Sequence, residues 1–168
     1  MALALAIAAV VVVADQLTTT WAQDRLSQGP IHVVWTLDLV LQYNSGSAFS
    51  LFQGAAPVLG VIAAVVVGIL IVVIRRARSN SLAASLGLVV GGAVGNLADR
   101  VFRSHNGAVV DFIALHWWPT FNVADASIVI GGILAAVILM KDGRERSGVS
   151  GDQADVPSGL PRNPDAGS

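Results

Sequence analysis

The sequence contains no cysteine and very little charge. Of its 168 residues, 12% are charged and 54% are hydrophobic, and the first 140 include neither Lys nor Glu. A soluble domain carries about 25% charged residues, so the composition predicts a one-domain integral membrane protein. The absence of Cys excludes disulfides, a thiol nucleophile and zinc–thiolate sites. The net charge of −1 gives no reason to expect a nucleic-acid partner.

Four apolar runs are long enough to cross a bilayer as helices, which takes about 20 mostly apolar residues. They are residues 1–20, 55–74, 81–99 and 122–140. The first run has no basic segment before it and the chain stays hydrophobic after it, which favours a membrane span over a cleaved signal peptide. Residues 1–141 are therefore expected to form an all-α, four-helix transmembrane domain. The Gly-, Pro-, Ser- and Asp-rich residues 142–168 predict a disordered tail.

The basic residues predict the orientation of these spans. Three arginines lie at 75–78, between the second and third spans, and three basic residues lie at 141–146, after the fourth. Because cytoplasmic loops are enriched in Lys and Arg, both clusters and both chain termini are expected in the cytoplasm. Residues 22–54 and 101–121 then face outward.

The first outward segment has a strand pattern. From Ile31 to Tyr43 every odd position is apolar, while the even positions include His32, Asp38 and Gln42. This alternation predicts a strand whose apolar face lies on the membrane surface or on the helices.

Polar residues gather where the spans meet the outer side. The set is Asp15, Gln16, Asn44, Asn96, Asp99, Arg100, Asp111, Asn122 and Asp125. Two fragments, "NLAD" at 96–99 and "NVAD" at 122–125, each place Asn and Asp three residues apart, on one helix face. Ionisable residues within membrane segments mark functional sites by default.

Paired carboxylates are the chemistry that this set supports best. Two adjacent Asp side chains share one proton, so that the ionised partner acts as general base on water while the neutral partner donates to the attacked carbonyl. Asp111 and Asp125 both lie in apolar surroundings. Asp99 has the alternative of an ion pair or helix-end hydrogen bond, and Asp15 that of a structural hydrogen-bond hub.

Other functions compete with peptide hydrolysis. A proton- or cation-coupled transporter also needs intramembrane Asp residues, but its relay should cross the whole bilayer. A Mg²⁺ enzyme could use Asp99, Asp111 and Asp125, although no phosphate-binding motif accompanies them. His32, His105 and His116 lie in outer segments without a Ser/His/Asp setting.

Five motifs, taken in their order and spacing, indicate a protein family. They are "DQLTT" at 15–19, "NSGSAFS" at 44–50, "GGAVGNLADR" at 91–100, "VVDFI" at 109–113 and "FNVADASI" at 121–128. Over about residues 3–141 the chain resembles the bacterial lipoprotein signal peptidases (type II signal peptidases, peptidase family A8). The resemblance implies four helices with a small extracytoplasmic β-sheet and a short surface helix.

The resemblance also implies an activity. It is that of an intramembrane aspartyl endopeptidase of the bacterial cell membrane, which cleaves diacylglyceryl prolipoproteins just before the lipidated Cys. No metal or cofactor is implied, the inhibitor is globomycin, and the protein is expected to be a monomer among membrane lipids. The catalytic pair falls on Asp111 and Asp125. The substrate-binding positions fall on Asp15, Asn44, Asn96, Asp99, Arg100 and Asn122.

One position departs from the family. The Lys that usually follows "DQ-x-T" is Thr19 here, so a basic contact near the lipid headgroups is either missing or supplied by Arg25. The Gly-rich face of residues 87–95 is open to two interpretations, close helix packing or room for acyl chains. Trp117 and Trp118 are typical of an interfacial aromatic belt.

Overall fold

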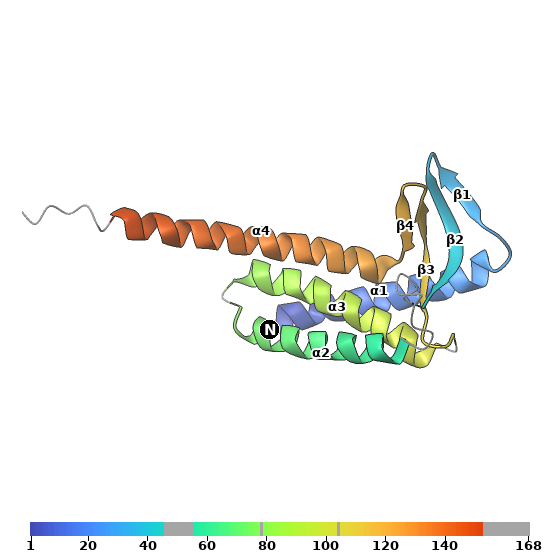
Figure 1. The fold of residues 1–168 in the computed structure, drawn as a ribbon, viewed down its shortest axis with the longest axis horizontal. Helices are drawn as coiled ribbons and strands as arrows, with labels where there is room; N and C mark the ends of the chain where they lie inside the picture. Colours follow the sequence, from blue (N-terminus) through green and yellow to red (C-terminus); the bar gives the residue numbers. More distant parts are fainter. Residues whose placement is uncertain (46–55, 78, 104, 153–168) are drawn as a thin grey trace, which may run out of the picture.

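The computed structural model describes residues 1–45, 56–77, 79–103 and 105–152. In chain order the elements are α1 (Ala2–Leu26), β1 (Ile31–Val34), β2 (Leu37–Asn44), α2 (Ala56–Arg75), α3 (Asn80–Phe102), β3 (Val109–Leu115), β4 (Trp118–Phe121) and α4 (Val123–Asp152). The helices run side by side and the strands form one sheet across their end (Figure 1). We call this the sheet-side end of the helices.

Three helices are long and apolar enough to cross a membrane: Ala2–Leu26, Asn80–Phe102 and Val123–Arg144. They coincide with the first, third and fourth predicted spans, so the chain is a multi-pass membrane protein. The second predicted span, residues 55–74, coincides with α2, whose apolar part Gly60–Arg75 is shorter. A fourth crossing therefore stays a prediction.

Glycine lets α3 pack closely against its neighbours. A Cβ built on Gly87 would lie 2.6 Å from the carbonyl oxygen of Ala4, and one on Gly91 would lie 2.7 Å from Val11 Cβ. On the α4 side, a Cβ on Gly92 would collide with the carbonyl oxygen of Ala124. Small residues allow such approaches where membrane helices pack, so the Gly-rich face is filled by α1 and α4 rather than left as room for acyl chains.

The four strands are antiparallel in the order β1-β2-β3-β4. The single strand predicted for residues 31–43 is wrong in one respect, because the chain turns at Trp35 and makes a hairpin. Trp35 adopts a φ of 52°, a local event that alternation of apolar residues does not reveal. The expected contact of the apolar face with the helices is confirmed for β2, where Leu39 and Leu41 pack against the end of α1.

Pairing between β2 and β3 connects two distant parts of the sequence. Asn44 lies opposite Val109, and Gln42 lies opposite Asp111. The sequence patterns did not predict β3, since Val109–Leu115 is apolar without alternation. This pairing brings "YN" of β2 next to "VVD" of β3 at the sheet-side end.

The short surface helix implied by the resemblance is not among the elements of the described residues, so it stays a prediction. One further feature differs from the sequence predictions. The tail predicted to be disordered from residue 142 begins instead as helix, because α4 continues to Asp152. Lys141, Arg144 and Glu145 are good helix formers, and the first proline after the span is Pro157. The remainder of the predicted tail lies outside the described residues.

The close contact at Gly92 makes a stability prediction. We expect Gly92→Ala to destabilise the protein by about 1–3 kcal/mol, as overpacking does, because the new methyl group meets Ala124 and Ile128. Gly132→Ala is the matched control on α4, since a Cβ there meets nothing within 4 Å. Thermal unfolding in detergent would measure both; equal melting temperatures would contradict the packing described for α3 and α4.

Candidate active site

Asp111 lies buried near the start of β3 with two amide donors on its carboxyl group. Its side chain is only 1% exposed. Asn44 Nδ2 of β2 donates to Oδ2 at 2.9 Å, and Asn122 Nδ2 donates to Oδ1 at 3.1 Å. Asp111 is therefore held by residues far from it in sequence, which only the folded chain brings together.

Asp125 lies in the first turn of α4. Its Oδ1 accepts a hydrogen bond from Asn96 Nδ2 of α3 at 2.7 Å. Asn122 and Asp125 also bond reciprocally, because the Asp125 amide donates to Asn122 Oδ1 at 2.8 Å and the Asn122 amide donates to Asp125 Oδ2 at 3.4 Å. This is a capping-box arrangement at the start of a helix, where the helix dipole favours a negative side chain.

Asn122 connects the two carboxyl groups. It is fully buried, and its Nδ2 lies 3.1 Å from Asp111 Oδ1 and 3.0 Å from Asn96 Oδ1. A continuous hydrogen-bond path thus runs from Asp111 through Asn122 to Asp125. The structure therefore brings together five of the predicted site residues: Asn44, Asn96, Asp111, Asn122 and Asp125.

Burial raises the pKa of Asp111 to about 7. Removal of water disfavours the charged form and is the largest cause, and the negative charges of Asp125 and Asp99 act in the same direction. The hydrogen bond from Asn44 and the charge of Arg100 oppose them. Asp111 can consequently hold or release a proton near neutral pH, as acid–base chemistry requires.

Asp99 supports the residue that precedes Asp111. Its Oδ1 accepts from Arg103 Nε at 2.8 Å, and its Oδ2 accepts from the backbone amide of Val110 at 3.1 Å. The alternative of an ion pair or helix-end bond is therefore confirmed for Asp99. Gln16 Nε2 donates a further hydrogen bond to Asp99 Oδ1 at 2.8 Å.

Asp15 plays the equivalent part beside Asp125. It is fully buried, and its Oδ1 accepts the backbone amide of Ala124 at 3.0 Å. Its Oδ2 accepts from Gln16 Nε2 at 3.1 Å. The structural hub proposed for Asp15 is confirmed by these contacts. The two carboxylates outside the Asp111–Asp125 path thus each hold the backbone next to one within it.

Arg100 lies at the edge of this group. Its Nη1 donates to the backbone oxygen of Asn96 at 3.1 Å. Its Nε is buried and has no acceptor among the described residues. The guanidinium is close enough to interact electrostatically with Asp125 and Asp111, so it provides a positive charge beside both.

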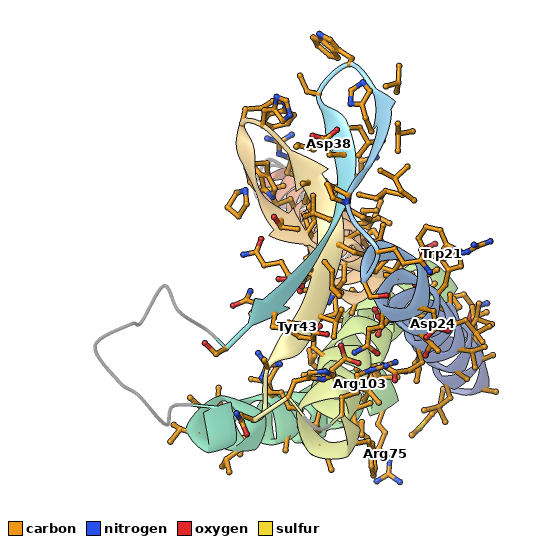
Figure 2. The ribbon with its side chains drawn as sticks, turned by 90° about the vertical axis from the view of Figure 1, so that its right-hand side faces the viewer. Trp21, Asp24, Asp38, Tyr43, Arg75 and Arg103 are labelled. Atoms are coloured by element: carbon orange, nitrogen blue, oxygen red, sulfur yellow. The ribbon has the colours of Figure 1, made fainter. Side chains whose placement is uncertain are left out.

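Sequence reasoning assigned no role to Gln16 or Arg103. Arg103 crosses from the end of α3 to α1, where it donates to Gln16, Thr20 and Gln23 as well as to Asp99 (Figure 2). The sequence could have predicted the Asp99–Arg103 ion pair, because Arg103 follows Asp99 by four residues and side chains at that spacing meet on a helix.

Thr19, where the resemblance led us to expect a Lys, is fully buried, and its hydroxyl has no hydrogen-bond partner among the described residues. Arg25, the expected substitute, is exposed and lines a separate cavity of about 440 Å³ with Trp21. The basic residue that does reach this part of α1 is Arg103.

The alternative chemistries find little support in the geometry. Within the described ranges, no three His, Cys, Asp or Glu side chains converge as metal ligands. His32 and His116 both contact Asp38, at 2.6 and 3.1 Å, at the end of the sheet far from Tyr43 (Figure 2). These histidines are exposed and lie apart from Asp111.

The comparisons with known proteins agree with one another. A sequence model of the family described as Signal peptidase (SPase) II matches residues 7–141. The lipoprotein signal peptidase of Mycobacterium leprae (strain Br4923) is 45% identical over 142 residues, 81% of this chain and 70% of that protein. That of Mycolicibacterium smegmatis (strain ATCC 700084 / mc(2)155) is 45% identical over 141 residues, 81% of this chain and 60% of that protein.

A solved structure has the same fold. It is a bacterial membrane enzyme determined by the in meso method at 1.9 Å, which matches with a TM-score of 0.76 and 28% identity over 84% of this chain and 95% of that one. Fold and site define a multi-pass membrane protein with a buried carboxylate centre. The chain belongs to the Signal peptidase (SPase) II family, and is thus a membrane-bound protease.

Asn122 caps the start of α4 and also donates a hydrogen bond to Asp111, and substitutions can separate these two roles. Asn122→Ser keeps an oxygen that can cap α4 but loses the amide that reaches Asp111, whereas Asn122→Ala loses both. We expect Asn122→Ala to be less stable than Asn122→Ser by about 1 kcal/mol, the usual value of an N-cap. Chemical unfolding in micelles would measure the difference, and equal stability would show that Asn122 does not cap α4.

Proposed function

We propose that this chain is an intramembrane aspartic endopeptidase that removes signal peptides from diacylglyceryl-modified prolipoproteins, cleaving just before the lipidated Cys. The carrying observation is the hydrogen-bond path from Asp111 through the buried Asn122 to Asp125. The names of the relatives, lipoprotein signal peptidases, support the substrate class.

The two carboxyl groups suit different roles. Asp125 stands at the positive end of the α4 dipole and accepts the Asn96 amide, a setting for a carboxylate that takes a proton from water. Asp111, with a pKa of about 7, can be the neutral partner that donates to the scissile carbonyl. Water attacks that carbonyl as Asp125 takes its proton, which gives a tetrahedral intermediate with two hydroxyl groups. The C–N bond then breaks, Asp125 passes its proton to the leaving amine, and one hydroxyl of the intermediate returns a proton to Asp111 as the new carboxyl group forms. Asn44, Asn122 and Asn96 keep both carboxyl groups in place.

The location of the site fits a lipid-anchored substrate. The site residues lie at the sheet-side end of the helices, where residues 22–54 and 101–121 are proposed to face outward and the termini the cytoplasm. A prolipoprotein held by its acyl chains would place its scissile bond near this boundary of the bacterial cell membrane, where water is available for hydrolysis. We expect a monomer that is inhibited by globomycin and uses no metal or cofactor.

The main alternative, a proton- or cation-coupled transporter, is not favoured. Its relay should continue through the bilayer, whereas the buried charged residues among those described, Asp15, Asp99 and Asp111, all belong to the sheet-side group. The family to which the chain belongs is one of signal peptidases.

Removal of either catalytic carboxylate tests the mechanism. We expect Asp111→Asn and Asp125→Asn each to lower kcat by about 10³-fold or more, because the amide cannot exchange the proton, while the near-isosteric side chains preserve folding. Cleavage of a purified diacylated prolipoprotein, with and without globomycin, is the measurement. Asp24→Asn, at an exposed position of α1, is the control and should keep its activity. Substantial cleavage by either of the first two variants would exclude the Asp111–Asp125 mechanism.

The pKa of Asp111 predicts the pH dependence. Activity should fall as pH rises through about 7, because the neutral form of Asp111 is lost. The Asn44 hydrogen bond lowers the pKa of Asp111, so Asn44→Ala should raise that pKa and move the alkaline limb to higher pH. The pH profile of kcat/KM for both proteins measures this. A flat profile between about pH 5 and pH 9, or a limb displaced to lower pH in Asn44→Ala, would contradict the assignment.

A further inference from the structure

The side chain of Arg103 connects α3 to α1, and the activity proposed above gives it no role. Arg103 is the residue at which α3 ends, and its backbone amide donates to the Asp99 carbonyl oxygen at 3.1 Å. Its side chain is 15% exposed and lies between the end of α3 and α1 (Figure 2). A largely buried cation needs acceptors of its own, and these acceptors show what Arg103 holds in place.

Every nitrogen of the guanidinium group has an acceptor. Nε donates to Asp99 Oδ1 at 2.8 Å, and Nη1 donates to Gln23 Oε1. Nη2 donates to the backbone oxygen of Gln16 at 3.3 Å, to Gln16 Oε1 at 3.1 Å and to Thr20 Oγ1 at 3.1 Å. The α1 partners are spaced by four and three residues, so they share one face of that helix. A lysine cannot reproduce this pattern, because all its donors are on one atom.

The Asp99 carboxyl group passes this contact on to the strand that carries Asp111. Asp99 is buried, and the backbone amide of Val110 donates to its Oδ2 at 3.1 Å. Arg103 therefore binds one oxygen of Asp99, while the residue next to Asp111 binds the other. A reacting group that is displaced by about 1 Å can lose about 100-fold in rate. The placement of Asp111 thus depends on how firmly the Asp99 carboxyl group is held.

We propose that Arg103 is a positioning residue of the peptidase, which holds the Asp99 carboxyl group against α1 and so fixes β3 at Val110, beside Asp111. The inference rests on the proposed function and adds a residue to the groups that serve it. Gln16 supports the same arrangement from α1, because it donates to Asp99 and accepts from Arg103. Since its nitrogens are bonded within the protein, Arg103 should act on kcat and not on substrate binding.

A contact between α1 and α3 that only stabilised the fold would behave differently. Its loss would lower the melting temperature and loosen the sheet as a whole. Loss of a positioning contact acts locally, at the Val110 amide, and leaves other parts of the β2–β3 pairing, such as Leu39 opposite Ile113, as they are. Local and general effects can therefore be told apart.

The kinetic test compares Arg103→Gln and Arg103→Lys with wild type in the cleavage of a purified diacylated prolipoprotein. Arg103→Gln should lower kcat by about 100-fold with KM little changed. Arg103→Lys keeps a charge beside Asp99 but loses most of the α1 contacts, and should lose about tenfold, the rate equivalent of a hydrogen bond to a charged group. Arg75→Gln, the same change at an exposed arginine that ends α2, is the matched control and should keep its activity. Wild-type kcat in Arg103→Lys, or a rise in KM in place of a fall in kcat, would overturn the inference.

A double variant tests whether Arg103 acts through Asp99. If it does, Arg103→Gln should cost less than about twofold in kcat when Asp99→Asn is already present, because the contact that it supports is then already weakened. Losses that multiply would show that the two residues act independently, and the positioning role would be wrong.

Hydrogen exchange separates this inference from the proposed function, because it needs no substrate. Isotope-labelled valine and isoleucine allow the exchange rates of the Val110 and Ile113 amides to be measured by NMR in micelles. In both Arg103 variants the Val110 amide should exchange about tenfold faster or more, the equivalent of one weakened hydrogen bond, while Ile113 keeps its wild-type rate. An unchanged rate at Val110, or an equal increase at both amides, would contradict the positioning role.

The two variants also guard against a failure to fold. If Arg103→Gln does not fold, Arg103→Lys decides both measurements, because it keeps the cation that the buried Asp99 needs. If wild type cleaves no diacylated prolipoprotein, the proposed function fails, while the exchange rates still decide whether Arg103 holds β3. If wild type cleaves it and the Arg103 variants match wild type, only the positioning role fails.

Discussion

The side-chain amide of Asn122 is the contact on which the rest of the site depends. It is fully buried and bonds at once to Asp111 on β3 and to Asn96 on α3, while its own residue caps α4 next to Asp125. Burial of a carboxylate is costly unless donors satisfy it. Asn122 therefore contacts β3 and α3 through its side-chain amide and caps the start of α4. These contacts fix the strand and both helices relative to one another.

The remaining buried carboxylates extend the same arrangement outward. Asp99 holds the backbone amide of Val110, just before Asp111, and Asp15 holds that of Ala124, just before Asp125. Gln16 donates to both Asp15 and Asp99, so the supports are themselves connected. This arrangement explains how the chain can place four Asp residues close together. Each has donors of its own, and the two that hold the backbone, Asp15 and Asp99, are distinct from the pair proposed for proton transfer, Asp111 and Asp125.

Much of the fold could be read from the sequence, because membrane insertion imposes simple requirements on length and polarity. Three predicted spans agree with helices, and the Asn–Asp spacing in "NLAD" and "NVAD" anticipated side chains that meet. The turn at Trp35, the strand Val109–Leu115 and the helical continuation past residue 141 were not anticipated. Alternation is a weak signal where a strand is short or buried on both faces, and helix propensity in a polar segment competes with its tendency to stay disordered.

The sequence by itself determined that polar residues gather at one end of apolar helices, that Asp111 and Asp125 are the candidate pair, and that the motifs resemble one peptidase family. Only the tertiary structure decided which polar groups touch. It separated Asp15 and Asp99, which hold backbone amides, from Asp111 and Asp125, and it revealed Gln16 and Arg103 as their partners. It also assigned the glycines of α3 to packing against α1 and α4. The physical reason is that hydrogen bonds and close packing act over a few ångströms between residues up to about a hundred positions apart, distances that no local pattern encodes.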